Sequence, residues 1–334
     1  MRLLFLWISL VATLSGSAQP VRKHGRLSVA GTQLVNERGH PVLLRGVSFG
    51  WHNWQPRYYT PGAVQWLASD WKATVVRAAM GIDPDGAYLQ DSARAVALVE
   101  AVIEGALRAG IYVIVDWHSH NIRTEAANRF FRHIACKYGH HPHLIYEIFN
   151  EPDHEGWAEV KTYSEELIAT IRALDPDNII LVGSPHWDQD LHLVAADPIR
   201  GATNIMYSMH FYAATHKAWL RERCDKALAA GIPLMLTEAS GMEATGNGPT
   251  DKAEWLRYLQ WAEKNRLSWL VWSVSDKNET CSMLQKGASP DGGWGPADLK
   301  ESGRLTRALL RAFSRRNGAR KAGAILSNTQ NQSR

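Results

Sequence analysis

Short segments made almost entirely of apolar residues recur along the chain about 25 to 40 residues apart, a spacing that suits strands separated by helices. Their composition is typical of parallel strands that are buried on both faces. Ahead of them, apolar and polar residues alternate between Leu27 and Leu44, which predicts a small β-hairpin. The segments predicted to be buried strands are residues 43–47, 74–79, 111–116, 144–149, 178–182, 204–209, 233–237 and 268–272.

Segments with helical periodicity lie between the predicted strands, at residues 92–109, 155–173, 219–230 and 251–265. Gly110 and Gly231 follow two of them, as expected of residues that end a helix. The repeated alternation of strand and helix predicts the α/β class and a closed (β/α)8 TIM barrel. An open, doubly wound sheet is the alternative, but no glycine-rich phosphate loop follows the first strand.

The composition narrows the range of functions. The 334 residues are 45% hydrophobic and 21% charged, which suits one large or two small folded domains and excludes a disordered chain. The formal net charge is only +4, so a nucleic-acid partner has little support. Three scattered cysteines are too few for a disulfide framework or a zinc site. The 14 tryptophans are many, and those outside the core are suited to stacking on flat, apolar ligand faces.

The two ends of the chain differ from the middle. Residues 1–14 join an early positive charge to an apolar stretch, and small residues follow up to Ala18. This pattern predicts a secretory signal peptide over residues 1–18, with a membrane anchor as the alternative. Residues 19–316 are then expected to form the barrel domain, and the polar, basic residues 317–334 a disordered tail. We expect a secreted or periplasmic monomer without membrane contact after signal cleavage.

Polar and aromatic residues stand at the carboxyl ends of the predicted strands. Pro152 stops the strand that begins at Leu144, so Glu151 is expected at the strand end, where barrel enzymes keep their chemistry. Helix capping by Glu151 is the alternative, but the second strand-end carboxylate, Glu238, favours a functional site. Two facing carboxylates suit glycoside hydrolysis. The residues expected to converge on this face are Arg77, His118, Asn150, Glu151, His210, Tyr212, Glu238 and Trp272.

Other chemistries have weaker signals. Asp116, His118 and His120 suggest metal ligands, but no second histidine pair completes a recognised ligand set. No Gly-x-Ser-x-Gly motif marks a serine nucleophile. We therefore predict neither a metal nor a cofactor.

Seven motifs together resemble glycoside hydrolase family 5, and within it the bacterial endo-β-1,4-glucanases, or cellulases. The resemblance extends from about Leu27 to Phe313 and is much more specific than Asn150-Glu151-Pro152 alone. The motifs are Leu44–Val47, Val76–Met80, Ile111–His118, Ile145–Pro152, Met209–Tyr212, Leu236–Glu238 and Trp272–Glu279.

The resemblance implies the roles of the two carboxylates. Glu151 matches the acid/base and Glu238 the nucleophile of a retaining double displacement that needs no cofactor. Hydrogen bonds from Arg77 and Tyr212 are expected to lower the pKa of Glu238 and keep it ionised. A poorly solvated setting and the nearby charge of Glu238 are expected to raise the pKa of Glu151.

The resemblance also implies supporting roles. Asn150 would hold the sugar 2-hydroxyl, and His118 and His210 would orient hydroxyls and carboxylates. Tryptophans would form the floor and the stacking platforms of the cleft, and a charged pair would bind a hydroxyl on the non-reducing side. These residues are Trp272 for the floor, Trp54 and Trp187 for the platforms, and Lys277 and Glu279 for the charged pair. The alternatives are that the two histidines are ordinary barrel residues, that Trp272 is a core residue, and that the charged pair is an exposed ion pair.

The chain also departs from the family pattern. Gly50 and Gly81 replace a histidine and a tyrosine that many members carry, and Ala239 follows Glu238 where an aromatic or aliphatic residue is common. Trp51 or His52 are expected to compensate. The implied substrate is a β-glucan polysaccharide. A mannanase, a xyloglucanase or a catalytically inactive carbohydrate-binding barrel is the alternative.

Overall fold

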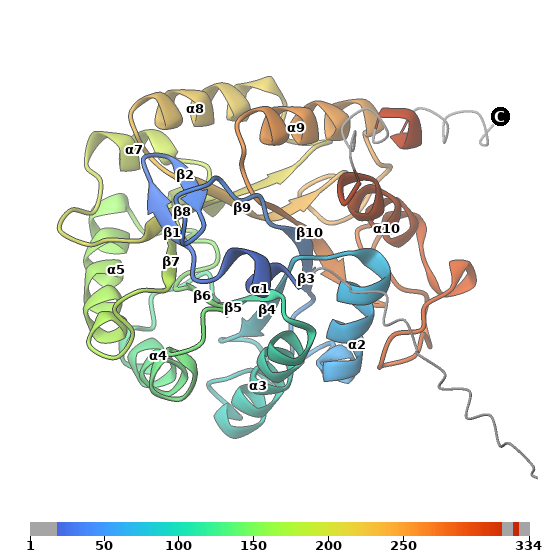
Figure 1. Cartoon of the computed structure of the whole chain (residues 1–334), viewed down its shortest axis with the longest axis horizontal. Coiled ribbons are helices and arrows are strands. Elements are labelled where there is room, and N and C mark those ends of the chain that lie inside the picture. Colours follow the sequence, from blue (N-terminus) through green and yellow to red (C-terminus); the bar gives the residue numbers. More distant parts are fainter. Residues whose placement is uncertain (1–18, 316–322, 327–334) are drawn as a thin grey trace, which may run out of the picture.

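The computed structural model describes residues 19–315 and 323–326, and its centre is a closed barrel of parallel strands (Figure 1). Each strand pairs with its neighbours in sequence, and β10 pairs with β3 to close the ring. This confirms the predicted (β/α)8 barrel. Its strands are β3 (Arg45–Phe49), β4 (Val75–Gly81), β5 (Tyr112–His118), β6 (Leu144–Glu147), β7 (Ile179–Val182), β8 (Ile205–Tyr212), β9 (Leu234–Ser240) and β10 (Trp269–Val274).

Helices surround the barrel (Figure 1). The periodicity predicts the bounds of α3 (Ser92–Ala109) correctly. Asp91 caps its first turn through the Arg94 amide, and Gly110, at φ +68°, ends it. The other helices are α1 (Pro20–His24), α2 (Pro61–Trp66), α4 (Thr124–Tyr138), α5 (Trp157–Arg172), α6 (Pro185–Asp188), α7 (Leu191–Ala196), α8 (Ala218–Ala229), α9 (Lys252–Lys264) and α10 (Glu301–Phe313), with short turns at Pro56–Tyr58, Leu67–Trp71 and Pro296–Asp298.

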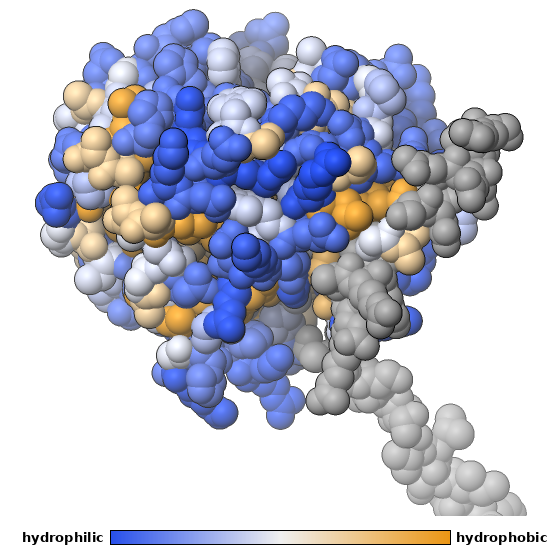
Figure 2. Space-filling view, turned by 90° about the horizontal axis from the view of Figure 1, so that it is seen from above, coloured by the Kyte–Doolittle hydropathy of each residue, from blue (hydrophilic) through white to orange (hydrophobic). Residues whose placement is uncertain are grey.

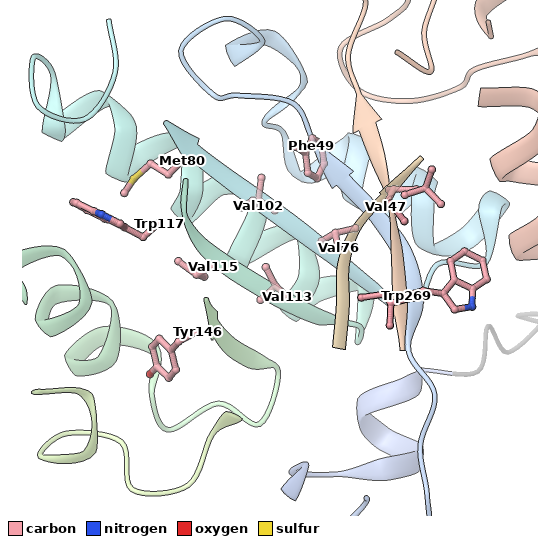
Figure 3. Packing of buried hydrophobic residues seen from close by; sticks show 14 of the residues in the cluster. Val47, Phe49, Val76, Met80, Val102, Val113, Val115, Trp117, Tyr146 and Trp269 are labelled. Atoms are coloured by element: carbon pink, nitrogen blue, oxygen red, sulfur yellow. The ribbon is translucent and has the colours of Figure 1, made fainter. Parts of the chain in front are cut away.

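The two-residue period of a strand separates the core from the site. In β5, Val113, Val115 and Trp117 point outward and pack in the large cluster between strands and helices, which Val102 of α3 also joins (Figure 3). The alternate residues of β5 therefore face the barrel interior, and they end with Asp116 and His118. The other strands alternate in the same way apart from irregularities in β9 and β10, so outward residues mainly supply stability and inward residues near the strand ends supply the site.

A second apolar cluster closes the amino-terminal end of the barrel. It joins inward residues near the strand starts, such as Ile114 and Ile145, to Val21 of α1 and to Leu34 of the hairpin β1 (Ser28–Ala30) and β2 (Gln33–Val35). Figure 1 shows this hairpin and α1 across one end of the barrel. The hairpin confirms the prediction for this segment, and the opposite, carboxyl end is left for the site.

The surface and the ends complete the description. Seen from above Figure 1, where α8 and α9 lie, the surface is mainly hydrophilic with small hydrophobic areas (Figure 2). None of the helices in the described ranges is long and apolar enough to span a membrane. The predicted signal peptide, residues 1–18, lies outside the described residues. Most of the predicted tail does so too, but residues 323–326 form a helical turn in which Leu326 is buried, unlike the disorder expected there.

Candidate active site

A cleft of about 500 Å³ opens at the carboxyl ends of the strands. It brings together every sequence-predicted site residue except Arg77 and Asn150, which are fully buried beneath it. The predicted residues that line it are Glu151, Glu238, His118, His210, Tyr212, Trp272, Trp54, Trp187, Lys277 and Glu279.

Glu151 and Glu238 face each other in this cleft. Glu151 follows β6, and Glu238 lies in β9, on the other side of β8 and its His210. Oxygens of the two carboxylates and a ring nitrogen of His210 all lie within 4.8 Å of one another. Retaining glycosidases separate their carboxyl groups by about 5 to 5.5 Å and inverting ones by about 6.5 to 9.5 Å. The spacing suits a direct attack on a sugar held between the two groups.

An irregularity in β9 aims Glu238 into the cleft. Ser208 of β8 pairs with Met235 of β9, and His210 pairs with Glu238. Between these pairs β8 advances by two residues and β9 by three. The extra residue on β9 is a bulge, which changes the direction of the following side chains. Both Thr237 and Glu238 therefore reach inward: Thr237 contacts His210, and Glu238 contacts Arg77.

Arg77 is the centre of a buried ion layer below the cleft. Its Nε donates to Glu147 at 2.5 Å, and its terminal nitrogens lie 3.0 Å from both Glu238 and Asp116. It also donates to Asn150 Oδ1 at 2.6 Å. Arg77 is the third residue of β4 and not its tip, so it lies under the carboxylates. A planar guanidinium with several donors suits this bridging position.

Glu238 receives the two hydrogen bonds expected from the sequence. The Tyr212 hydroxyl donates to Oε1 at 2.6 Å, and Arg77 donates to Oε2 at 3.0 Å. The expected direction of its pKa is nevertheless wrong. Burial and the negative charge of Glu151 raise the pKa of Glu238, and they outweigh the lowering by His210, Arg77 and Tyr212.

The expected direction for Glu151 is also wrong, because the neighbouring His210 acts as a charged hydrogen-bond donor. Burial alone would raise the pKa of Glu151, but the hydrogen bond and charge of His210 hold it below its usual value. His210 Nδ1 lies 2.8 Å from Glu151 Oε1, and Nε2 lies 3.3 Å from buried Asp188. Burial lowers the pKa of His210, but Asp188, Glu147 and Glu151 raise it well above 6.5. The two opposite pKa shifts favour a hydrogen bond in which His210 carries the proton and Glu151 accepts it.

His118 forms the wall of the cleft next to Trp272. Its Nδ1 lies 2.7 Å from Asp116, and its ring stacks on Trp272 at 5.2 Å with an angle of 3° between the planes. Burial and the charge of Arg77 lower the pKa of His118 well below 6.5, so the ring is neutral. A neutral ring fixed by one carboxylate leaves its other nitrogen to face a ligand.

Aromatic and charged side chains form the rim of the cleft. Trp54 and Trp187 are 49% and 43% exposed, which is unusual for tryptophan. Trp187 lies in a turn whose residues His186, Trp187 and Asp188 all have left-handed backbones, with φ of 53°, 56° and 62°. Lys277 pairs with Glu279 and also lies 5.5 Å above the Trp54 ring.

Trp51, and not His52, fills the space beside Gly81, one of the departures from the family pattern. A side chain on Gly81 would meet Trp51 Cε3 at 2.7 Å, so the indole occupies the position of a residue-81 side chain. Trp51 lines the cleft, with its ring 4.3 Å from that of His118. His52 is buried, accepts a hydrogen bond from the Gly81 amide and has a pKa lowered to about 4 by burial.

Sequence reasoning missed several residues of the site. Glu147 could have been found, since it is the one charge inside the apolar run before Glu151. Its partner Ser208 and the buried Asp188 carry no comparable signal, because only the barrel brings Ser208 to Glu147 and Asp188 to His210. The missed lining residues include Gln55, Gln189, His216 and Ser275.

The carboxylates could in principle hold a metal ion. Within the described residues, Glu151, His210 and Glu238 form the one group of histidine, cysteine or acidic side chains compact enough to do so. Both oxygens of Glu238 already accept hydrogen bonds, one of them from the cation Arg77, and Glu151 is bonded to His210. A positively charged guanidinium on a ligand disfavours a second cation there. The donor set fits proton transfer better.

The barrel, the open cleft and two carboxylates at this spacing place the chain in the class of glycoside hydrolases. The family model described as cellulase, glycosyl hydrolase family 5, matches residues 35–278. Endoglucanase Z of Dickeya dadantii is 38% identical over 307 residues, which are 91% of this chain and 69% of that protein.

Solved structures agree with this match. A structure from Cytophaga hutchinsonii has a TM-score of 0.86 and 42% identity, covering 93% of this chain and 99% of that one. The catalytic domain of Thermobifida fusca endoglucanase Cel5A has a TM-score of 0.83 and 33% identity, covering 88% and 99%, and a variant of it was solved with cellotetraose. The chain therefore belongs to glycosyl hydrolase family 5, as its motifs suggest.

Proposed function

We propose that the chain is an endo-β-1,4-glucanase that cleaves internal bonds of β-glucan chains with retention of configuration. The observation that carries the proposal is the pair Glu151 and Glu238, whose oxygens lie within 4.8 Å in an open cleft. The related endoglucanases and the cellotetraose complex of one relative support the choice of substrate.

The first half of the reaction forms a covalent intermediate. Glu238 attacks the anomeric carbon while Glu151 gives a proton to the departing glycosidic oxygen. Because His210 Nδ1 lies 2.8 Å from Glu151 Oε1, Glu151 takes this proton from His210 and passes it on. Tyr212 and Arg77 hold Glu238 in position during the attack.

The second half releases the sugar. Glu151, now a carboxylate, takes a proton from water as the water attacks the anomeric carbon, and Glu238 leaves as a free carboxylate. Glu151 then returns the proton to His210, which restores the starting state. Two inversions give overall retention. No cofactor takes part in either step.

Asn150 and the aromatic residues would bind the sugar. Arg77 fixes Asn150 Oδ1, and the buried Nδ2 has no hydrogen-bond partner among the described residues, so it suits a sugar 2-hydroxyl. Trp272 would form the floor below the cleaved bond, with Trp54 and Trp187 as platforms on either side. Lys277 and Glu279 would bind a hydroxyl beside Trp54.

The decisive experiment measures reducing-sugar release from carboxymethylcellulose, mixed-linkage β-glucan, xyloglucan and mannan side by side. We expect the two unbranched β-glucans to be cleaved fastest, with the β-anomer as first product by NMR. Faster cleavage of mannan or xyloglucan would contradict the substrate. Binding without cleavage, unchanged in Glu151→Gln, would show an inactive carbohydrate-binding barrel. Secretion after cleavage near Ala18 remains a prediction, which sequencing of the mature amino terminus tests.

A further inference from the structure

Three tryptophans are strongly exposed in the described residues, and only two of them line the cleft. Trp54 and Trp187 belong to the cleft, while the third, Trp219, is 42% exposed and lies outside it. Trp219 is the second residue of α8, which follows β8 through a short loop. A helix that follows a barrel strand begins at the carboxyl end of the barrel, so Trp219 lies on the same face as the cleft.

Trp219 is connected to the Trp187 side of the cleft. Its ring contacts His216, which lines the cleft, with 5.8 Å between ring centres and a nearly perpendicular angle of 72°. The guanidinium of Arg223 lies 5.2 Å from the Trp219 ring centre. Arg223 in turn donates to the Gln189 carbonyl at 3.0 Å, two residues after Trp187. Figure 1 shows α7 and α8 side by side along this edge.

These contacts hold the ring in place although much of it faces solvent. Arg223 is itself anchored by Asp190 at 2.5 Å, so the cation below the ring is fixed. A cation over an indole stabilises its orientation, and an aromatic side chain held in advance loses little conformational entropy when a ligand binds. The indole therefore presents a flat apolar face to solvent in an orientation that is already fixed, which suits stacking on a ligand.

We infer that Trp219 is an outer aromatic subsite that stacks on a glucosyl unit of the chain beyond the unit bound at Trp187. This inference rests on the proposed function, since it locates the binding site for the part of a longer β-1,4-glucan that extends beyond the cleft. The substrate would leave the cleft past Trp187 and Gln189 and reach the indole of Trp219. The residue binds substrate at a distance from the reacting atoms, so its effect depends on chain length.

The test compares Trp219→Ala with the wild type on cello-oligosaccharides of three to six units and on carboxymethylcellulose. The ratio of wild-type to variant kcat/KM should rise with chain length and reach about five- to tenfold for the longest oligosaccharide, as for one well-packed interface aromatic. Trp219→Phe should keep most of the activity. Leu174→Ala, which removes an exposed apolar side chain at the other end of the barrel, is the control and should change no ratio.

A binding measurement separates this inference from the proposed function. In a Glu238→Ala background, calorimetry with cellohexaose should show weaker binding when Trp219→Ala is added, and cellotriose should show a smaller change. An equal loss at every length would indicate a structural role through His216 and overturn the inference, as would no loss at any length. Failure of the wild type to cleave any β-1,4-glucan would instead overturn the proposed function.

Discussion

The buried ion layer and the rim of the cleft use polar residues in opposite ways. Around Arg77, every carboxylate has a protein partner and is almost fully buried, whereas Trp54, Trp187 and Lys277 are about half exposed. Buried charges are tolerated only when they are paired, so the layer must be complete before a substrate arrives. The rim gains its partners from the ligand. Substitutions in the layer should therefore affect stability and turnover, and those in the rim mainly binding.

The largest effect is expected from Glu238→Ala, because it removes the attacking group and leaves most of the layer intact. We expect hydrolysis to fall by about 10³-fold or more, as for other essential residues of a catalytic unit. Added azide, a small nucleophile that fits the vacated space, should restore turnover and yield a glycosyl azide of inverted configuration. Product analysis by NMR checks this outcome, and near-native activity without azide would show that another group attacks.

Arg77→Met tests whether the layer also supports the fold. It would leave Glu147, Asp116 and Glu238 without their shared cation, and removing one partner of a buried ion pair costs about 3–5 kcal/mol. Urea unfolding followed by tryptophan fluorescence measures the loss. Arg77→Lys keeps the charge but cannot reach all partners at once, so it should lie between Met and the wild type. A variant as stable as the wild type would contradict the layer's structural role.

Sequence reasoning predicted the barrel well because the two-residue and 3.6-residue periods are local properties. It predicted the two carboxylates because Pro152 and the strand end are visible in the chain. It failed on the pKa directions of both: burial and the charge of Glu151 raise the pKa of Glu238, and His210, whose charge depends on Asp188 and Glu147, lowers that of Glu151. Such neighbours come from separate strands, and only the closed ring brings them within a few ångströms.

The dependence of activity on pH should report the ionisation of Glu238 and of the His210–Glu151 pair. Glu238 must be ionised to attack. Burial and the charge of Glu151 raise its pKa above the usual 4.5 of glutamate, so activity should decline with falling pH before pH 4.5 is reached. Asp188 and the glutamates outweigh burial and raise the pKa of His210, so the proton of the His210–Glu151 pair should be lost only well above pH 6.5. The profile of kcat/KM against pH measures both limbs. A basic limb below 6.5 would mean that His210 does not hold the proton.

A rim substitution, Trp187→Ala, should weaken binding and leave the layer unchanged. We expect KM to rise about tenfold with a smaller change in kcat, as for an aromatic residue that dominates a contact. Trp187→Phe should recover most of the loss, and the unfolding free energy of both variants should stay within about 0.5 kcal/mol of the wild type. If kcat fell as steeply as for Glu238→Ala, the rim would belong to the chemistry and the contrast would be wrong.

The smallest effect is expected from Lys277→Ala, because Lys277 forms an ion pair with Glu279 at the rim that is open to solvent. Exposed ion pairs contribute about 0.2–1 kcal/mol and are screened by salt, so KM should rise about two- to threefold at low ionic strength and less at high. Lys137→Ala is a matched control, since Lys137 also pairs with a glutamate, Glu100, and lies 5.0 Å above an aromatic ring, but on α4. It should leave KM unchanged. A tenfold rise for Lys277→Ala that persists in salt would show that this pair is desolvated by the substrate and behaves like the buried layer.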